Sequence, residues 1–213
     1  MGRFTKRHFW EWFRKNNGEY LDLNNKGKKE TAYWINEFHA HLRAYCRSIS
    51  FNLTVYEKNT AALTITALGR ATRFKTIDAL VALAPEVPGW TITALEPPMP
   101  AAYGLEEQLI AAGIEVSELY FSFYRNIRGE TGIVVYHPLC TEENRAAFLH
   151  LAQGVVYNLL GERSFGLDIP FLKVANLSHA GDADIKKLEE LPAGLDQRLS
   201  PLVVNGAGIL SGL

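Results

Sequence analysis

The stretch that decides the fold is residues 51–67, FNLTVYEKNTAALTITA, in which apolar and polar side chains alternate. Phe51, Leu53 and Val55 occupy every second position, and the alternation resumes after the polar segment 57–60. Successive side chains of a strand point to opposite faces, so a period of two indicates a half-buried strand. The stretch therefore predicts a β-hairpin with one apolar face and one polar face.

This hairpin begins a pattern that occurs twice, because residues 51–95 and residues 119–174 are both predicted to have the order β-β-α-β. The predicted parts of the second copy are two strands around a turn at 126–129, a helix from Glu142 to Leu160 that stops at Gly161, and a strand from Phe165 to Val174 with Pro170 inside it. We interpret the pattern as an internal structural repeat, although β-β-α-β is a common unit and chance is the alternative. The six strands would form one mixed sheet or two three-stranded sheets, with helices on one face.

Two helices are predicted before the hairpin, over residues 3–15 and 29–49. The second carries an apolar stripe at 3-4-3-4 spacing, which is typical of an amphipathic helix. We therefore expect an α+β fold with two N-terminal helices followed by two β-β-α-β units forming a mixed sheet with helices on one face. The predicted parts are a helical segment 1–50, a core 51–175, and a C-terminal wrap and flexible tail 176–213, all within one domain.

The composition excludes several classes of protein. The chain has 213 residues, 47% of them hydrophobic, and a formal net charge of −1, which is typical of a globular protein and not of a disordered chain. The near-neutral charge argues against nucleic acid as a partner. Residues 1–30 nevertheless carry eight basic and four acidic side chains. This excess indicates intramolecular docking, a patch for an acidic partner, or simply a solvated face.

The sequence also bears on compartment and cofactors. We found no apolar run long enough for a membrane span and no signal peptide, so we expect a cytoplasmic protein without membrane contact. Neither of the glycine-rich phosphate-binding motifs occurs, so no cofactor is expected.

Two motifs carry a family resemblance. Phe9-Trp10-Glu11-Trp12-Phe13 and the run from Leu160-Gly161-Glu162 into Phe165-Gly166-Leu167-Asp168 resemble those of a group of uncharacterised bacterial proteins. The chain is also loosely similar to DUF695-type domains. These families have no established activity, so the resemblance implies only a bacterial, cytoplasmic α+β protein.

Three residues are candidates for catalysis. His137 and Cys140 lie close together at a predicted strand-to-helix junction, where a histidine could act as base for a thiol. Asp168 is an acid in an otherwise apolar predicted strand. The competing interpretation is that Cys140 is a small buried residue and that Asp168 faces solvent. No metal site is expected, because His39 and His41 are two residues apart on a helix and point in opposite directions.

Two surfaces are candidates for binding: the aromatic N-terminal helix and the polar face of the sheet. The candidate residues are Trp10, Trp12, Tyr56, Thr64, Thr66 and Tyr124. An aromatic platform for RNA would also need interleaved basic residues, which the quoted strands lack. We therefore expect a non-catalytic protein that binds a protein partner or has a regulatory role. The alternatives are a small hydrolase or transferase that uses the Cys/His pair, and a homo-oligomer joined near Pro170.

Overall fold

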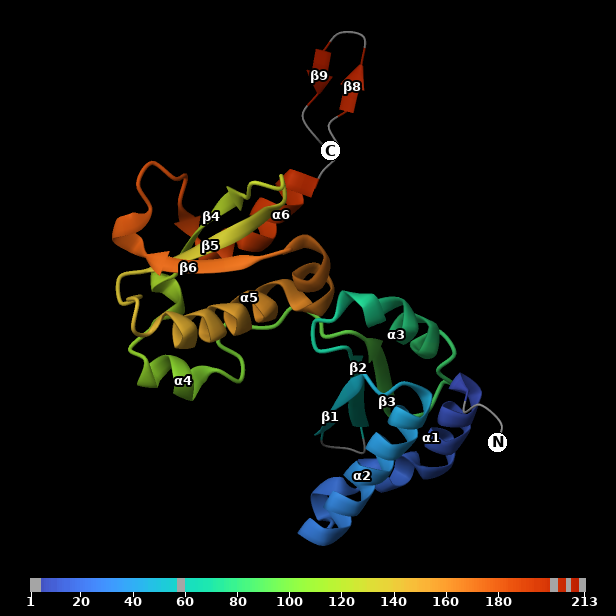
Figure 1. Cartoon of the computed structure of the whole chain (residues 1–213). Helices are drawn as coiled ribbons and strands as arrows, with labels where there is room; N and C mark the ends of the chain where they lie inside the picture. The colour runs from blue at the N-terminus through green and yellow to red at the C-terminus, as the bar shows by residue number, and fades with distance from the viewer. Residues whose placement is uncertain (1–4, 57–59, 200–202, 206–207, 211–213) are drawn as a thin grey trace. The chain divides into compact units, whose positions relative to one another are not determined.

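The computed structural model describes residues 5–56, 60–199, 203–205 and 208–210 (Figure 1). The chain folds into two compact units, residues 1–96 (unit 1) and residues 97–213 (unit 2). This division differs from the predicted parts 1–50, 51–175 and 176–213, because each β-β-α-β unit builds a hydrophobic core of its own.

Unit 1 contains a three-stranded mixed sheet with helices packed on one face. Its elements are α1 (Lys6–Leu21), η1 (Leu23–Asn25), α2 (Lys28–Tyr45), β1 (Ser50–Tyr56), β2 (Thr60–Thr66), η2 (Ala71–Arg73), α3 (Phe74–Val81) and β3 (Trp90–Ala94). The strand order is β1-β2-β3, with β1 antiparallel and β3 parallel to the central β2. Phe51, Leu63 and Ile65 from the sheet share a buried core with residues of all three α-helices. The polar face opposite carries the exposed Asn52 and Tyr56, as the alternation predicts.

Helix α1 is longer than predicted. It begins at the N-cap Thr5, whose side chain accepts a hydrogen bond from the His8 N–H, and it continues past Gly18 to Leu21. Tyr20 explains the extra turn, because its ring is fully buried and its hydroxyl donates to the Trp34 carbonyl at 2.9 Å. Tertiary packing thus overrides the local stop signal.

Lys26 lies at the turn between α1 and α2, where it is surrounded by carboxylates. Its ammonium lies 2.9 Å from Glu19, 2.8 Å from Glu30 and 3.7 Å from Asp22, and its side chain is 9% exposed. Hydrogen bonds from the Lys26 ammonium to Glu19 and Glu30 hold the pKa of Lys26 well above its ordinary value. Part of the basic excess of the first 30 residues is therefore neutralised within the fold.

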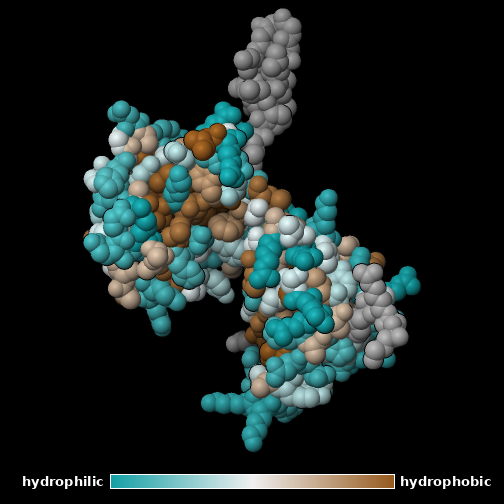
Figure 2. Space-filling model, viewed as in Figure 1, coloured by the Kyte–Doolittle hydropathy of each residue, from teal (hydrophilic) through white to brown (hydrophobic). Residues whose placement is uncertain are grey.

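Unit 2 contains a four-stranded mixed sheet in the order β6-β5-β4-β7. Its elements are α4 (Glu106–Ala111), η3 (Val116–Glu118), β4 (Tyr120–Arg125), β5 (Thr131–His137), α5 (Arg145–Asp168), β6 (Leu172–Asn176), η4 (Leu177–His179), β7 (Lys186–Lys187), η5 (Leu188–Glu190), α6 (Leu191–Leu199), β8 (Val203–Asn205) and β9 (Gly208–Leu210). Strand β4 is antiparallel and β6 parallel to the central β5, and α5 and α6 pack on the same apolar positions of the sheet. On the face that Figure 2 shows, hydrophobic residues of unit 2 gather where Figure 1 draws β5, β6 and α5.

The C-terminal part of unit 2 corrects two sequence predictions. Gly161 does not end the helix: it takes φ 70° and ψ 167°, breaks α5 into two stretches, and leaves residues up to Asp168 helical. Pro170 consequently precedes the last strand of the repeat instead of lying in it. The predicted wrap over 176–213 contains β7 and α6, and the predicted flexible end falls largely on residues 200–202, 206–207 and 211–213, which lie outside the described residues.

The three strands of each β-β-α-β unit have the same topology, which confirms the predicted repeat of elements and the α+β fold. In unit 1, Phe51 pairs with Ile65, which pairs with Ala94; in unit 2, Phe121, Val135 and Val174 are paired in the same way. The six strands of the repeat form two separate sheets and not one, and the sheet of unit 2 gains a fourth strand, β7, which the sequence did not predict.

Candidate functional site

His137, the proposed base, ends β5 and is 1% exposed. Its Nδ1 accepts a hydrogen bond from the Leu139 N–H at 3.2 Å. Its Nε2 faces the Glu118 carboxylate at 3.5 Å, and its ring lies 5.6 Å from that of Phe148. The end of the strand thus positions the imidazole, whose Nε2 has no hydrogen-bond partner among the described residues. The sequence did not indicate the Glu118 carboxylate near it.

Cys140 and Asp168 do not complete a catalytic set with this histidine. Burial raises the pKa of the Cys140 thiol, which is 2% exposed, so the reactive thiolate is disfavoured. Asp168 accepts a hydrogen bond from the Ser164 hydroxyl at 2.5 Å and precedes the start of β6, whereas His137 pairs with Asn176 at the far end of that strand. Four strand residues separate the two ends by about 13 Å.

His39 and His41 contact different aromatic rings. The ring of His39 lies 4.8 Å from that of Phe51, and His41 stacks on Trp12 at 4.1 Å. Within the residues that the structure describes, no group of three or more His, Cys, Asp or Glu could hold a metal ion.

The predicted binding residues of the N-terminal helix belong largely to the core. Trp10 is 4% exposed, and its indole N–H donates to the Leu80 carbonyl at 2.8 Å. Trp12 is half-buried against Phe38 and His41. We therefore assign Trp10 mainly to the core, because its indole N–H and its ring contacts with Phe9 and Phe13 serve the fold.

The predicted polar sheet face is divided between the two units. Tyr56 is exposed and Thr64 half-buried in unit 1, whereas Tyr124 is exposed in unit 2. Thr66 is 1% exposed, and its hydroxyl accepts a hydrogen bond from the Leu68 N–H, so it belongs to the core. These residues lie on two separate sheets and do not form the single face that the sequence suggested.

The expectation that aromatic strand residues lack basic neighbours is wrong for unit 2. The Lys173 ammonium lies 4.2 Å from the centre of the Tyr124 ring, and the Lys187 ammonium lies 4.1 Å from that of Tyr120. Both lysines come from strands far along the chain, so the alternation within β4 and β5 could not reveal them. Lys187 also donates to the Tyr120 hydroxyl and to the Ser117 carbonyl, so its ammonium is already occupied.

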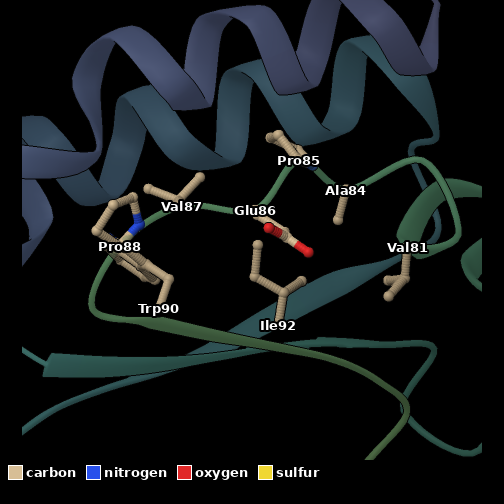
Figure 3. A pocket seen from close by; sticks show the side chains of 8 residues that line it. All are labelled: Val81, Ala84, Pro85, Glu86, Val87, Pro88, Trp90 and Ile92. Atoms are coloured by element: carbon tan, nitrogen blue, oxygen red, sulfur yellow. The ribbon is translucent and has the colours of Figure 1, made fainter.

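A cleft of about 580 Å³ lies in unit 1 (Figure 3). It lies between strand β3 and the loop that leads to it from α3. Its lining side chains are apolar apart from the Glu86 carboxylate and the Trp90 indole N–H, but polar atoms make up about half of the lining surface. The lining residues are Val81, Ala84, Pro85, Glu86, Val87, Pro88, Trp90 and Ile92.

The loop sequence explains why the cleft stays open. Pro85 and Pro88 cannot continue the helix or pair as strand residues, because proline lacks an N–H. Gly89 takes φ 80°, which favours glycine, and turns the chain so that the Trp90 N–H donates to the Val87 carbonyl at 3.1 Å. The loop therefore runs back beside β3 without closing onto it (Figure 3).

Two of the residues that line the cleft carry polar side-chain groups. Glu86 is exposed, and Figure 3 shows its carboxylate extending into the space beside Ala84 and Ile92. Nε1 of Trp90 is buried and has no hydrogen-bond partner among the described residues. The Trp90 ring is fixed by an edge-on contact with Phe13 at 4.8 Å between ring centres. A buried donor without an acceptor is costly to the fold.

Strand β3 adds an unpaired edge to the cleft. Among the described residues it pairs with β2 alone. The Ala61 N–H donates to the Gly89 carbonyl and the Leu95 N–H to the Ile65 carbonyl, which sets the register. Backbone groups alternate in direction along a parallel strand, so those of Ile92 and Ala94 point away from β2. Because the Ile92 side chain lines the cleft, the free edge and the cleft are contiguous.

Sequence reasoning did not identify Glu86, Trp90 or Ile92 as site residues. The two prolines indicated a helix stop, and the alternation of Trp90 and Ile92 indicated a strand. A carboxylate between two prolines, with a glycine and a tryptophan directly after them, was the available signal.

Comparison with known proteins gives no further guide, because no family model, curated protein or solved structure matches this chain. The resemblance to DUF695-type domains stays a prediction. Within the described ranges, no helix is long and apolar enough to cross a membrane.

Proposed function

We propose that this protein binds an extended segment of a partner protein in the cleft beside β3 and has no catalytic role. The observation that carries the proposal is a cleft with mostly apolar side chains and one exposed carboxylate, which adjoins a strand edge that has no partner strand among the described residues. A peptide that adds a strand to a sheet edge gains main-chain hydrogen bonds, and adjacent pockets select its side chains.

The cleft specifies the chemistry of that segment. An apolar side chain fits between Ile92 and the prolines of the loop, because the side chains of this lining are apolar apart from those of Glu86 and Trp90. A lysine or arginine of the segment pairs with the Glu86 carboxylate, which forms no ion pair within the described part of the chain.

The geometry supports binding over the alternative of a hydrolase or transferase. His137 and Cys140 are both almost completely buried, and Asp168 lies at the other end of β6. A nucleophile needs a lowered pKa or an adjacent base, whereas the pKa of Cys140 is raised.

The test is a selection of random twelve-residue peptides displayed on phage against the full-length chain, with affinity measurements on synthetic peptides afterwards. We expect the enriched peptides to combine an apolar residue with a neighbouring lysine or arginine. Loss of one charge-assisted hydrogen bond in Glu86→Gln should weaken their binding about tenfold. N-methylation of the peptide backbone at alternate positions should abolish binding, because strand addition needs these N–H groups.

Glu107→Gln is the matched control, because Glu107 is an equally exposed carboxylate on α4 of unit 2. It should bind the same peptides as the wild-type protein. The proposal fails if no peptide is enriched over an empty surface. It also fails if the enriched peptides bind the Glu86→Gln and Ile92→Ala variants as tightly as the wild-type chain.

A further inference from the structure

A second, smaller recess adjoins the cleft in unit 1. It has a volume of about 190 Å³ and is lined by Arg7, Trp10, Glu11, Arg14, Leu83 and Pro85. Arg7 and Arg14 are seven residues apart on α1, so they lie on the same helix face with Glu11 between them. Leu83, which is 53% exposed, and Pro85 form the apolar wall opposite the arginines.

The two arginines have no ion partner in the chain as described. Neither guanidinium lies within 4.0 Å of a carboxylate of a described residue, Glu11 included. Lys26, which belongs to the same basic stretch, shows the opposite arrangement, because three carboxylates surround it. The excess positive charge of α1 therefore remains open at the recess.

This charge selects an anionic group. A guanidinium presents its N–H donors in a planar fork that matches a carboxylate, and two such forks beside an apolar wall favour an acidic side chain of a peptide. Glu11 reduces the positive charge of the recess, which fits a single carboxylate better than the dense phosphates of a nucleic acid.

Pro85 lines both the recess and the cleft, so the two sites form one continuous surface with charges of opposite sign. We propose that the recess holds an acidic side chain of the same segment that occupies the cleft. This inference rests on the proposed function and adds to it the order of the charged residues along the partner segment. The partner segment carries a carboxylate on one side of its apolar anchor and a cationic residue on the other.

The same phage-display selection tests the inference when it is repeated on Arg7→Glu and Arg14→Glu variants. Peptides selected on the wild-type chain should be enriched in Asp or Glu at a fixed distance from the apolar residue. Reversal of one arginine should weaken these peptides about tenfold in low salt. A peptide whose acidic residue is replaced by arginine should recover part of the lost affinity for the variants only.

Lys15→Glu is the matched control, because Lys15 is an exposed basic residue of α1 outside the recess. It should change affinity less than about twofold, since exposed charges away from an interface act weakly. Arg7 and Arg14 are not buried, and circular dichroism should show unchanged folding in their variants.

The outcomes separate the two proposals. If the wild-type chain selects no peptide, the proposed function and this inference fall together. If peptides are selected through Glu86 but show no acidic preference, or bind the Arg7→Glu and Arg14→Glu variants normally, only this inference falls. It also falls if single-stranded dT12 binds through the two arginines more tightly than the acidic peptides do.

Discussion

Trp10→Phe distinguishes a core role of the N-terminal aromatic helix from a binding role. The substitution removes the 2.8 Å hydrogen bond from the indole to the Leu80 carbonyl and shortens a ring that is 4% exposed. The Leu80 carbonyl keeps a second donor, the Leu83 N–H at 3.1 Å, so the lost hydrogen bond costs about 1 kcal/mol. The smaller ring leaves a cavity between Phe9 and Phe13 that costs about 1–2 kcal/mol more.

Urea unfolding of the full-length chain measures this change. We expect Trp10→Phe to lower the free energy of unfolding by about 2–3 kcal/mol, which moves the midpoint by about 1 M. Trp12→Phe is the matched variant on the same helix, and it should lower the free energy of unfolding by about 1 kcal/mol because Trp12 is only half-buried.

A core role for Trp10 is refuted if Trp10→Phe unfolds within about 0.5 kcal/mol of the wild-type chain, which is the range of ordinary surface substitutions. Trp10 would then be free to serve a partner, as the sequence suggested.

Three more predictions concern the backbone, the thiols and the histidines. Gly161→Ala should destabilise unit 2 by about 1–3 kcal/mol in urea, because φ 70° with ψ 167° is open essentially to glycine alone; an unchanged midpoint would contradict this conformation. Iodoacetamide should alkylate the half-exposed Cys46 before the buried Cys140 at every pH up to about 9. Mass spectrometry of the products measures the order of modification, and modification of Cys140 first would support the enzyme hypothesis. Burial lowers the pKa of His39 and His41 from the ordinary 6.5, so the folded chain favours the neutral form of both histidines. The two histidines therefore stabilise the fold fully above pH 6.5, and this stabilisation is lost as the pH falls below 6.5. A double glutamine variant should accordingly show a flatter decline of the urea midpoint from about pH 6.5 to about pH 5.

The sequence predicted the strands of the repeat well because their signal is local. Phe51, Leu53 and Val55 alternate over a few residues, and the pleat of a strand converts this alternation directly into a buried face. The end of α1 was missed because Tyr20, which anchors the last turn, depends on a hydrogen bond to Trp34 in the next helix. The break at Gly161 was misjudged as a stop, because a glycine can mark a change of direction within a helical region as well as its end.

The candidate site was less predictable than the fold because its residues gain their role from tertiary packing. Glu86 and Ile92 are ordinary loop and strand residues in sequence, and they form a cleft only because the loop stays away from β3. The aromatic residues that stood out in sequence, Trp10 above all, stood out because a helix of this composition must be packed. An abundance of aromatic side chains thus indicated a core here and not a surface.

Lys26 has a consequence for chemical labelling of the protein. Reductive methylation and acylation need an accessible, deprotonated amine, and this ammonium is enclosed by Glu19, Asp22 and Glu30. Lys28 and Lys29, the next lysines along the chain, are exposed and lie at the start of α2. The labelling rate of Lys26 can therefore be compared with the rates of Lys28 and Lys29, which lie in the same part of the sequence. A higher relative rate at Lys26 reports local opening of the turn between α1 and α2.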